Sequence, residues 1–357
     1  MVLDLDLPPA ELALQLVNIS SVSGEEQALA GAIGGALSAL PHLTCRRDGD
    51  TVVAQTSLGR RRRVIVAGHL DTVPVAGNLP GRLADGRLWG RGSVDMKGGL
   101  AAMLAAAVRL DSPASDVTWV FYDNEEVAQA KSGLGRVQRH HPDWLAGDFA
   151  ILCEPTNARL EGGCNGTIRV VVRAHGTAAH SARPWMGVNA IHGLVPALGR
   201  LVRFEPATVR VDGLDYREAL NAVGIEGGTA PNVIPDRAAV TVNYRFAPDK
   251  PESEARRILE ALFEGYQVEV VDSAPSARPG LTNPAAGRLA AITEAHGGGP
   301  AIAKEGWTDV ARFYQAGIPA VNLGPGDPSL AHQDDEACPA EQIGRVADIL
   351  VEYLVRN

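Results

Sequence analysis

Several acids and histidines in this sequence come at or shortly after the ends of short apolar runs, as the glutamates of "VFYDNEEV" do. Apolar runs of this length are typical of buried strands, and ligand sites in open α/β sheets lie at the carboxyl ends of the strands. Separate segments of the chain are therefore expected to meet at one place. The residues expected there are His69, Asp95, Glu126, Glu154 and His332.

Such a group of carboxylates needs cations, because clustered acids repel each other and lose hydration when they are buried. Two divalent ions solve this problem if Asp95 bridges them, since each ion then contacts one imidazole and two carboxylates and keeps positions open to water. Ions ~3.5–4 Å apart can activate a shared water and polarise the carbonyl to be cleaved. These donors suit Zn²⁺, with Co²⁺ or Mn²⁺ as alternatives.

Two residues beside the expected ligands are assigned separate roles. Successive side chains of an extended chain point in opposite directions, so Glu125 remains available when Glu126 binds metal. A carboxylate in a dry cleft can take a proton from water, which predicts Glu125 as the general base. Asp71, two residues after His69, is expected to accept a hydrogen bond from that imidazole and to fix its orientation. An H-x-D pair such as His69 and Asp71, or a Glu-Glu pair such as Glu125 and Glu126, more often marks a turn when it occurs alone. Only the complete set of residues therefore indicates a site.

The elements that must position these residues fall into two domains. Strand-like runs alternate with helical patterns at first, which is typical of α/β structure with a largely parallel sheet, and Ser23 and Glu26 stand at capping-box spacing before one helix. Residues 166–277 instead read β-α-β-β-α-β, the ferredoxin-like order. We therefore predict an α/β/α catalytic domain from residues 1–165 and 278–357, with an α+β domain inserted into it.

Composition limits the classes of partner. The chain has 357 residues, of which 45% are hydrophobic, so two domains can each bury a core. The net charge of −9 argues against nucleic acid or an anionic membrane as a partner. Four cysteines without a C-x-x-C pair suit a reducing compartment, and no apolar run reaches the ~20 residues of a membrane span. The sequence thus predicts a cytoplasmic protein that acts on a small molecule.

Five motifs resemble the M20 family of di-metal amidohydrolases and peptidases. They are "GHLDTVP", "LWGRGSVDMKGGLAAML", "NEE", "CEPT" and "AHQDDE", and the resemblance covers nearly the whole chain. It implies that one metal lies on His69 and Glu154. The other would lie on Glu126 and His332, with Asp95 between the two. It also implies Glu125 as the general base and Asp71 as the residue that orients His69.

Four further segments resemble those family members that hydrolyse the succinyl amide of N-succinyl-LL-2,6-diaminopimelate, a step of lysine and cell-wall synthesis. They are "GGCNGTIRV", "AHSARPWMGVNAIH", "LNAVGIEGGTAPNVIPD" and "VNYRFAPD". This likeness implies a homodimer formed through the inserted domain, which would also serve as a lid. It places His180 and Asn232 in the active site of the neighbouring subunit, where His180 would stabilise the developing oxyanion.

An anionic amide substrate of this kind needs cationic partners, and guanidinium groups bind carboxylates well. Arg183 in "HSARP" and Arg245 in "VNYRF" match arginines of the family that do this. Gly306 opens "GWTD", which matches a family loop whose backbone N–H groups can bind a carboxylate. Trp307 stands where many relatives have a small residue, so the resemblance does not define the shape of this subsite.

Two alternatives remain open. Another reaction of the family, such as acetylornithine deacetylation or the cleavage of dipeptides or of carboxy-terminal residues, would use the same metal site. A relative that keeps the fold as a binding module without catalysis is the second alternative. Such a protein should have lost ligands, whereas all five are present here together with Glu125 and Asp71.

Overall fold

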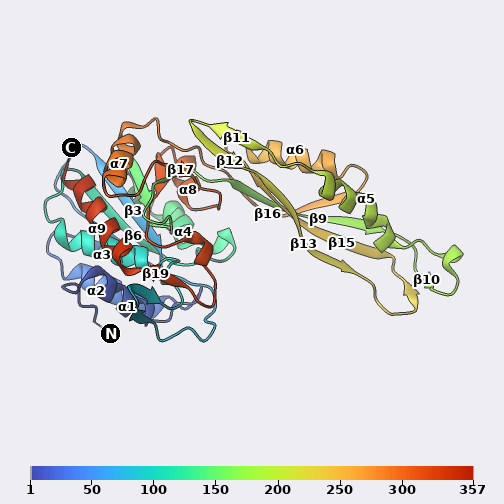
Figure 1. Ribbon diagram of the computed structural model, residues 1–357, viewed down its shortest axis with the longest axis horizontal. Coiled ribbons are helices and arrows are strands. Elements are labelled where there is room, and N and C mark those ends of the chain that lie inside the picture. The colour runs from blue at the N-terminus through green and yellow to red at the C-terminus, as the bar shows by residue number, and fades with distance from the viewer. Residues whose placement is uncertain (1, 357) are drawn as a thin grey trace. The chain divides into compact units, whose positions relative to one another are not determined.

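The computed structural model describes residues 2–356 and divides the chain into two compact units (Figure 1). Unit 1 comprises three stretches, Met1–Gly162, Gly280–Ile302 and Arg312–Asn357. Unit 2 comprises Gly163–Pro279 and Ala303–Ala311. The bounds 166–277 derived from the sequence stay a prediction about domains. The short segment Ala303–Ala311, which the sequence analysis placed in the catalytic domain, is grouped with unit 2.

Unit 1 is built around an eight-stranded mixed sheet with the strand order β1-β2-β6-β3-β7-β18-β8-β17. Its strands are β1 (Thr44–Asp48), β2 (Thr51–Gln55), β3 (Arg63–His69), β6 (Asp116–Tyr122), β7 (Phe149–Leu152), β8 (Glu161–Gly162), β17 (Ile302–Ala303) and β18 (Ala320–Asn322). The central strands β6, β3, β7 and β18 pair in parallel, whereas β1, β2 and β8 pair antiparallel with their neighbours. The predicted parallel centre is confirmed. A separate three-stranded sheet contains β4 (Arg82–Ala84), β5 (Arg87–Trp89) and β19 (Ala337–Pro339).

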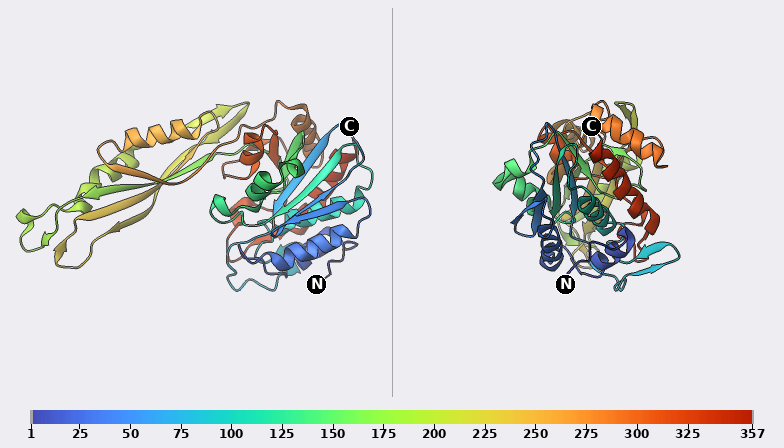
Figure 2. Two further views of the ribbon diagram at one scale, coloured as in Figure 1. Left: turned by 180° about the vertical axis from the view of Figure 1, so that it is seen from behind. Right: turned by 90° about the vertical axis from the view of Figure 1, so that its left-hand side faces the viewer.

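Helices cover both faces of the eight-stranded sheet (Figure 2). The helices of unit 1 are α1 (Pro9–Val17), α2 (Gln27–Ser38), α3 (Lys97–Arg109), α4 (Gly133–His140), α7 (Pro284–Ala295), α8 (Val310–Gln315) and α9 (Ala340–Val355), with 3₁₀ turns η1 (Gln129–Lys131), η2 (Pro142–Leu145) and η4 (Pro328–Leu330). On one face, α1, α2, α3, α7 and α9 share one hydrophobic core with β2, β3, β6 and β7. Helix α4 contacts β2 and packs beside η2. The expected α/β/α layering is confirmed.

The start of α3 lies very close to the strand ends, which matters because several expected ligands flank it. A Cβ atom at Gly99 would collide with the backbone oxygen of Cys153, and one at Gly68 would lie 2.5 Å from the Cε atom of Met96. Only glycine permits such an approach. The backbones that carry His69, Asp95 and Glu154 are thereby held close together.

Unit 2 has the predicted β-α-β-β-α-β order, formed by β9, α5, β13, β15, α6 and β16. Its elements are β9 (Gly166–His175), β10 (Ala179–His180), η3 (Pro184–Met186), α5 (Ala190–Arg203), β11 (Thr208–Val211), β12 (Leu214–Arg217), β13 (Ala219–Gly227), β14 (Val233–Ile234), β15 (Arg237–Phe246), α6 (Glu252–Leu262) and β16 (Gln267–Ala274). The four long strands are antiparallel in the order β13-β15-β9-β16. Alternate side chains of β9 and β15, such as Val170 and Val242, form a core with Leu194 of α5 and Leu259 of α6. The ferredoxin-like prediction is confirmed.

Within residues 2–356, no helix combines the length and the apolar character needed to cross a membrane. The expected cytoplasmic location stays a prediction.

Candidate metal centre

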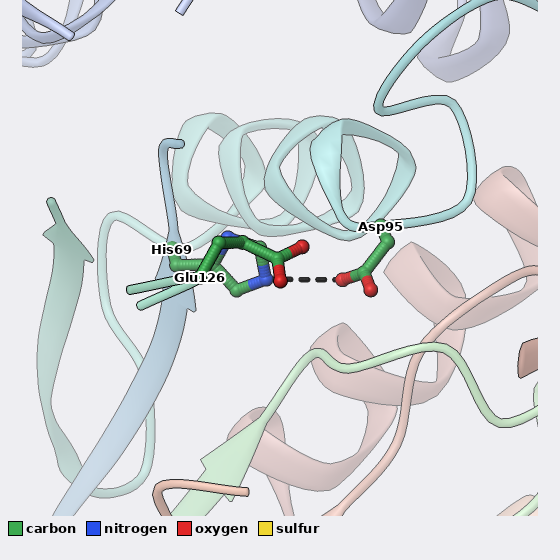
Figure 3. A group of neighbouring side chains, drawn as sticks. All are labelled: His69, Asp95 and Glu126. Atoms are coloured by element: carbon green, nitrogen blue, oxygen red, sulfur yellow. Dashed lines mark hydrogen bonds and ion pairs between the residues drawn. The ribbon is translucent and has the colours of Figure 1, made fainter. Parts of the chain in front are cut away.

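Three of the expected ligands meet beside the carboxyl end of β3. His69 is the last residue of β3, Asp95 lies in the loop before α3, and Glu126 lies in the loop after β6. Each offers one ligand atom, and these atoms all lie within 4.8 Å of one another. The His69 Nε2 atom is 3.0 Å from Asp95 Oδ1, and Figure 3 shows this contact with the Glu126 carboxylate beside it. Imidazole and carboxylate donors so arranged fit a divalent metal ion.

The two remaining expected ligands lie beside this group. The Nε2 atom of His332 is 2.8 Å from Glu126 Oε1 and 3.4 Å from Asp95 Oδ2. His332 adopts φ = +67°, an uncommon conformation for a residue with a side chain, and such strain is concentrated at functional sites. Glu154 follows β7, is buried, and its charge acts on His69. The structure thus brings together all five residues that the strand-end argument selects.

The charges at this site depend strongly on each other. Hydrogen bonds to Asp95 and Glu126 raise the pKa of His332 to about 10. Burial alone would lower the pKa of His69, but contacts with Asp71, Asp95 and Glu154 raise it well above its usual value. Burial alone would raise the pKa of Asp95, but its hydrogen bonds with both imidazoles lower it instead. The surrounding acids therefore favour positive charge at both imidazoles, and dications bound at this site would meet the same requirement.

Asp71 has more partners than the sequence indicates. The Nδ1 atom of His69 lies 2.9 Å from the backbone oxygen of Asp71 and 3.6 Å from its carboxylate. The carboxylate also accepts hydrogen bonds from the backbone N–H groups of Glu125 and Glu126, at 2.9 and 3.0 Å, and from the Ser23 hydroxyl at 2.7 Å. One buried carboxylate therefore fixes both the expected metal ligand His69 and the backbone that carries the adjacent glutamates.

The predicted capping box at Ser23 and Glu26 is wrong. Helix α2 begins at Gln27 without a side-chain cap. Ser23 binds Asp71 instead, and Glu26 Oε1 accepts hydrogen bonds from the N–H groups of Gly24 and Asn124, at 3.0 and 3.1 Å. Both side chains therefore brace the loop that carries Glu125, and the half-buried Glu125 follows Asn124 directly. The sequence spacing is compatible with either role, and only the fold decides between them.

Three expected substrate residues of unit 2 lie together beside the short β10–β14 ribbon. His180 pairs with Val233, the N–H of Ser181 donates to the oxygen of Asn232 at 2.9 Å, and the N–H of Arg183 donates to the oxygen of His180 at 2.8 Å. The His180 Nδ1 atom accepts a hydrogen bond from Ala182 N–H at 3.1 Å. A neutral ring that accepts at Nδ1 carries its proton on Nε2, and can therefore donate to an oxyanion.

Arg245 and Gly306 belong to the opposite end of the same unit. Arg245 pairs with Thr167 near the start of β9, and burial together with the charge of Arg169 lowers its pKa. The loop of Gly306 is anchored nearby, because Asn165 N–H donates to the oxygen of Lys304 and the Trp307 indole donates to the oxygen of Pro275 at 3.1 Å.

The length of β9 separates these two groups within one chain. His180 follows the end of this ten-residue strand, whereas Arg245 faces its beginning. At about 3.3 Å per residue, the strand spans roughly 30 Å. One small amide substrate is too short to contact both groups of a single unit 2.

The fold and the site define a class of protein, the metal-dependent hydrolases with an α/β catalytic domain and an inserted α+β domain. Residues 65–356 match "Peptidase family M20/M25/M40", and the chain belongs to this family. The resemblance noted from its motifs is confirmed.

Two relatives match over nearly their whole length. DapE of Mycobacterium tuberculosis (strain H37Rv) is 50% identical over 355 residues, with 99% of both chains covered. The succinyl-diaminopimelate desuccinylase of Corynebacterium glutamicum is 46% identical over 362 residues, which cover 99% of this chain and 97% of the relative. Among solved structures, a tripeptidase of Staphylococcus aureus aligns with a TM-score of 0.80 and 21% identity, covering 99% of this chain and 98% of that one. The last likeness concerns the fold alone.

Proposed function

We propose that this protein hydrolyses the succinyl amide of N-succinyl-LL-2,6-diaminopimelate to succinate and LL-2,6-diaminopimelate. The observation that carries the proposal is the full-length similarity to the Corynebacterium glutamicum desuccinylase. The group of imidazoles and carboxylates in unit 1 supports a metal-dependent hydrolysis. We also propose a cytoplasmic location, because the four cysteines are free thiols, which suits a reducing compartment.

The residues of unit 1 would have two separate roles in hydrolysis, metal binding and proton transfer. Two ions, Zn²⁺ in our proposal and Co²⁺ or Mn²⁺ as alternatives, would be held by His69, Asp95, Glu126, Glu154 and His332. When bound, they would activate water and polarise the amide carbonyl. Glu125 takes a proton from the water whose oxygen bonds to the carbonyl carbon. It then passes this proton to the amide nitrogen as the C–N bond breaks, which releases succinate and the amine.

The substrate's carboxylates would be bound by residues of two copies of unit 2: Arg245 and the backbone of Gly306 from one chain, and Arg183, which lies beside His180, from the partner chain. Asn232 would contribute beside His180. Arg245 is the sharpest test, because a half-buried guanidinium favours an anionic partner and the nearby Arg169 adds positive charge. His180 would donate from Nε2 to the carbonyl oxygen as negative charge develops on it.

Arg245→Gln is expected to raise KM for the succinylated substrate about 10–100-fold, the usual cost of one charge-assisted hydrogen bond. Arg256→Gln is a matched control in the same unit, because Arg256 lies exposed on α6 and pairs with Glu260 at 2.7 Å. Steady-state kinetics of both variants with the metal-loaded enzyme measure the difference. Equal KM values in the two variants would remove Arg245 from the substrate site.

A homodimer through unit 2 completes the proposal. Strand β13 is an edge of its sheet, and its Val223 and Ile225 are 58% and 61% exposed. Helix α5, which contacts β13, exposes Val195 and Val202 on one face. Unpaired edges and contiguous apolar surface favour burial against a second copy. The separation of His180 from Arg245 within one chain further supports a site in which His180 and Asn232 come from the partner subunit.

The substrate itself is tested by a parallel assay of the metal-loaded protein with N-succinyl-LL-2,6-diaminopimelate, N-acetylornithine and a dipeptide panel. We expect kcat/KM to be highest for the succinylated substrate, by at least ~10²-fold, because sites built for polar groups reject analogues that leave those groups unpaired. A preference for acetylornithine or for a dipeptide would assign a different reaction of the same family.

A further inference from the structure

We propose that Glu336 is the positioning residue for Asp95, the side chain that would bridge the two metal ions. Glu336 lies in the loop just before β19, and its side chain is 1% exposed. The inference rests on the proposed metal-dependent function. Glu336 is not one of the five expected metal ligands, and its role would be to hold Asp95 in the position that metal binding requires.

The Glu336 carboxylate accepts four hydrogen bonds from one short loop. Its Oε2 atom accepts from Arg91 Nη1 at 3.0 Å and from the N–H of Gly92 at 3.1 Å. Its Oε1 atom accepts from the N–H of Val94 at 2.8 Å and from the N–H of Asp95 itself at 3.1 Å. Successive N–H groups that converge on one anion form a rigid concave nest, so the loop is shaped around this carboxylate.

Further contacts fix the position of Glu336 relative to that loop. Its backbone oxygen accepts from the N–H of Gly90 at 3.1 Å, and the adjacent residue Ala337 pairs with Trp89 between β19 and β5. Arg91 also donates to the oxygens of Pro74 and Gln333, at 3.1 Å each. The carboxylate is therefore a fixed point, and the loop that carries Asp95 is held to it.

The contacts of Asp95 show why this anchoring would matter for the metals. Asp95 Oδ1 lies 3.0 Å from His69 Nε2, and Asp95 Oδ2 lies 3.4 Å from His332 Nε2. His332 precedes Glu336 by four residues, so one short segment carries a ligand and also anchors the bridging ligand. A residue that orients a metal ligand typically changes metal affinity or activity 10–100-fold when it is replaced.

A carboxylate is required because both of its oxygens accept. Glutamine at position 336 has one oxygen and one NH₂ group, so two of the four donors would face another donor. A buried donor without an acceptor is unfavourable, and the loop would move to relieve it. Asp95 would move with it, since its own N–H is one of the four donors.

Asp116 offers a matched control for the general effect of removing a buried, loop-binding carboxylate. It accepts from Leu58 N–H at 2.8 Å, Arg60 N–H at 2.9 Å and Thr56 Oγ1 at 2.9 Å, and it is 4% exposed. Asp116 begins β6, whereas Glu126 follows the other end of that strand. Asp116→Asn therefore disturbs a similar network at the opposite edge of the sheet.

The experiment uses full-length wild-type, Glu336→Gln and Asp116→Asn proteins, stripped of metal and titrated with Zn²⁺ against a chelator of known affinity. We expect Glu336→Gln to weaken the binding of at least one of two Zn²⁺ ions about 10–100-fold. The absorption spectrum of the Co²⁺-loaded variant should differ from that of the Co²⁺-loaded wild type. The fold decrease in kcat should exceed the fold change in KM. Asp116→Asn should lower Tm but leave Zn²⁺ affinity and the Co²⁺ spectrum as in the wild type.

Each outcome is decisive. Wild-type Zn²⁺ affinity and an unchanged Co²⁺ spectrum in Glu336→Gln would overturn the inference while leaving the proposed function intact. A wild-type chain that binds none of Zn²⁺, Co²⁺ and Mn²⁺ would instead overturn the proposed function and this inference with it. If Glu336→Gln does not fold, Glu336→Asp carries the test, because it keeps the charge but is one methylene shorter. Weakened Zn²⁺ binding at near-normal Tm supports the inference, and unchanged binding refutes it.

Discussion

Glu125→Gln is expected to lower kcat by at least ~10² while the protein keeps its full content of metal. The amide has nearly the same shape as the carboxylate but cannot take a proton from water. The backbone contact from Glu125 N–H to Asp71 does not depend on the side chain, so the loop should stay in place. Turnover of the succinylated substrate and metal content by elemental analysis are the two measurements.

The neighbouring variant Glu126→Gln serves as the control. Glu126 contacts His332 at 2.8 Å and offers one of the expected ligand atoms. Its replacement should therefore lower both the metal content and the activity. The two variants thus differ in metal content although they change adjacent residues in the same way. Near-normal turnover in Glu125→Gln would refute its assignment as the general base.

Mixing two inactive variants is expected to restore activity if His180 acts in the partner subunit. A dimer of one Glu125→Gln chain and one His180→Ala chain contains one site with both residues intact. Random exchange of subunits should therefore give about a quarter of wild-type activity, because half of the dimers are mixed and each has one intact site. Activity is measured after the two proteins are unfolded and refolded together.

Each variant refolded alone provides the baseline for this experiment. If His180 served its own chain, every site of a mixed dimer would lack one residue, and no activity would return. The distance along β9 between His180 and Arg245 in unit 2 favours the first result.

The meeting of the expected ligands at one place was predictable because it follows from general rules that act locally. Acids and histidines at or after the ends of apolar runs lie at strand ends: His69 ends β3, and Glu126 and Glu154 follow β6 and β7. The alternation of buried and exposed residues in β9 and β15 likewise determines unit 2. In these cases the pattern and its structural consequence lie within the same short segment.

The supporting contacts were not predictable, because they join segments that are distant in the chain. Glu336 binds the N–H of a residue 241 positions earlier, and Asp71 binds N–H groups 54 and 55 positions later. The polar composition of "AHQDDE" is typical of a solvated loop, although its third acid, Glu336, is buried. Nothing in its immediate neighbours distinguishes Glu336 from the exposed Asp334 and Asp335.

The segment Ala303–Ala311 shows a similar limit for domain boundaries. Its residues follow the linker that leads back to unit 1, so their order in the sequence favours the catalytic domain. Several of their contacts are with unit 2, for example from Lys304 to Asn165 and from Trp307 to Pro275. Composition marks the linker, but it does not show which earlier residues a later loop contacts.

The insertion of unit 2 into unit 1 has a consequence for synthesis on the ribosome. The four-stranded sheet of unit 2 is complete once β16 has emerged at Ala274, but β7 of unit 1 waits for its parallel neighbour β18 at Ala320–Asn322. All four residues of β7 are buried in the finished fold. The nascent chain therefore exposes an apolar strand edge while more than a hundred residues are translated, and such an edge favours aggregation or chaperone binding during this interval.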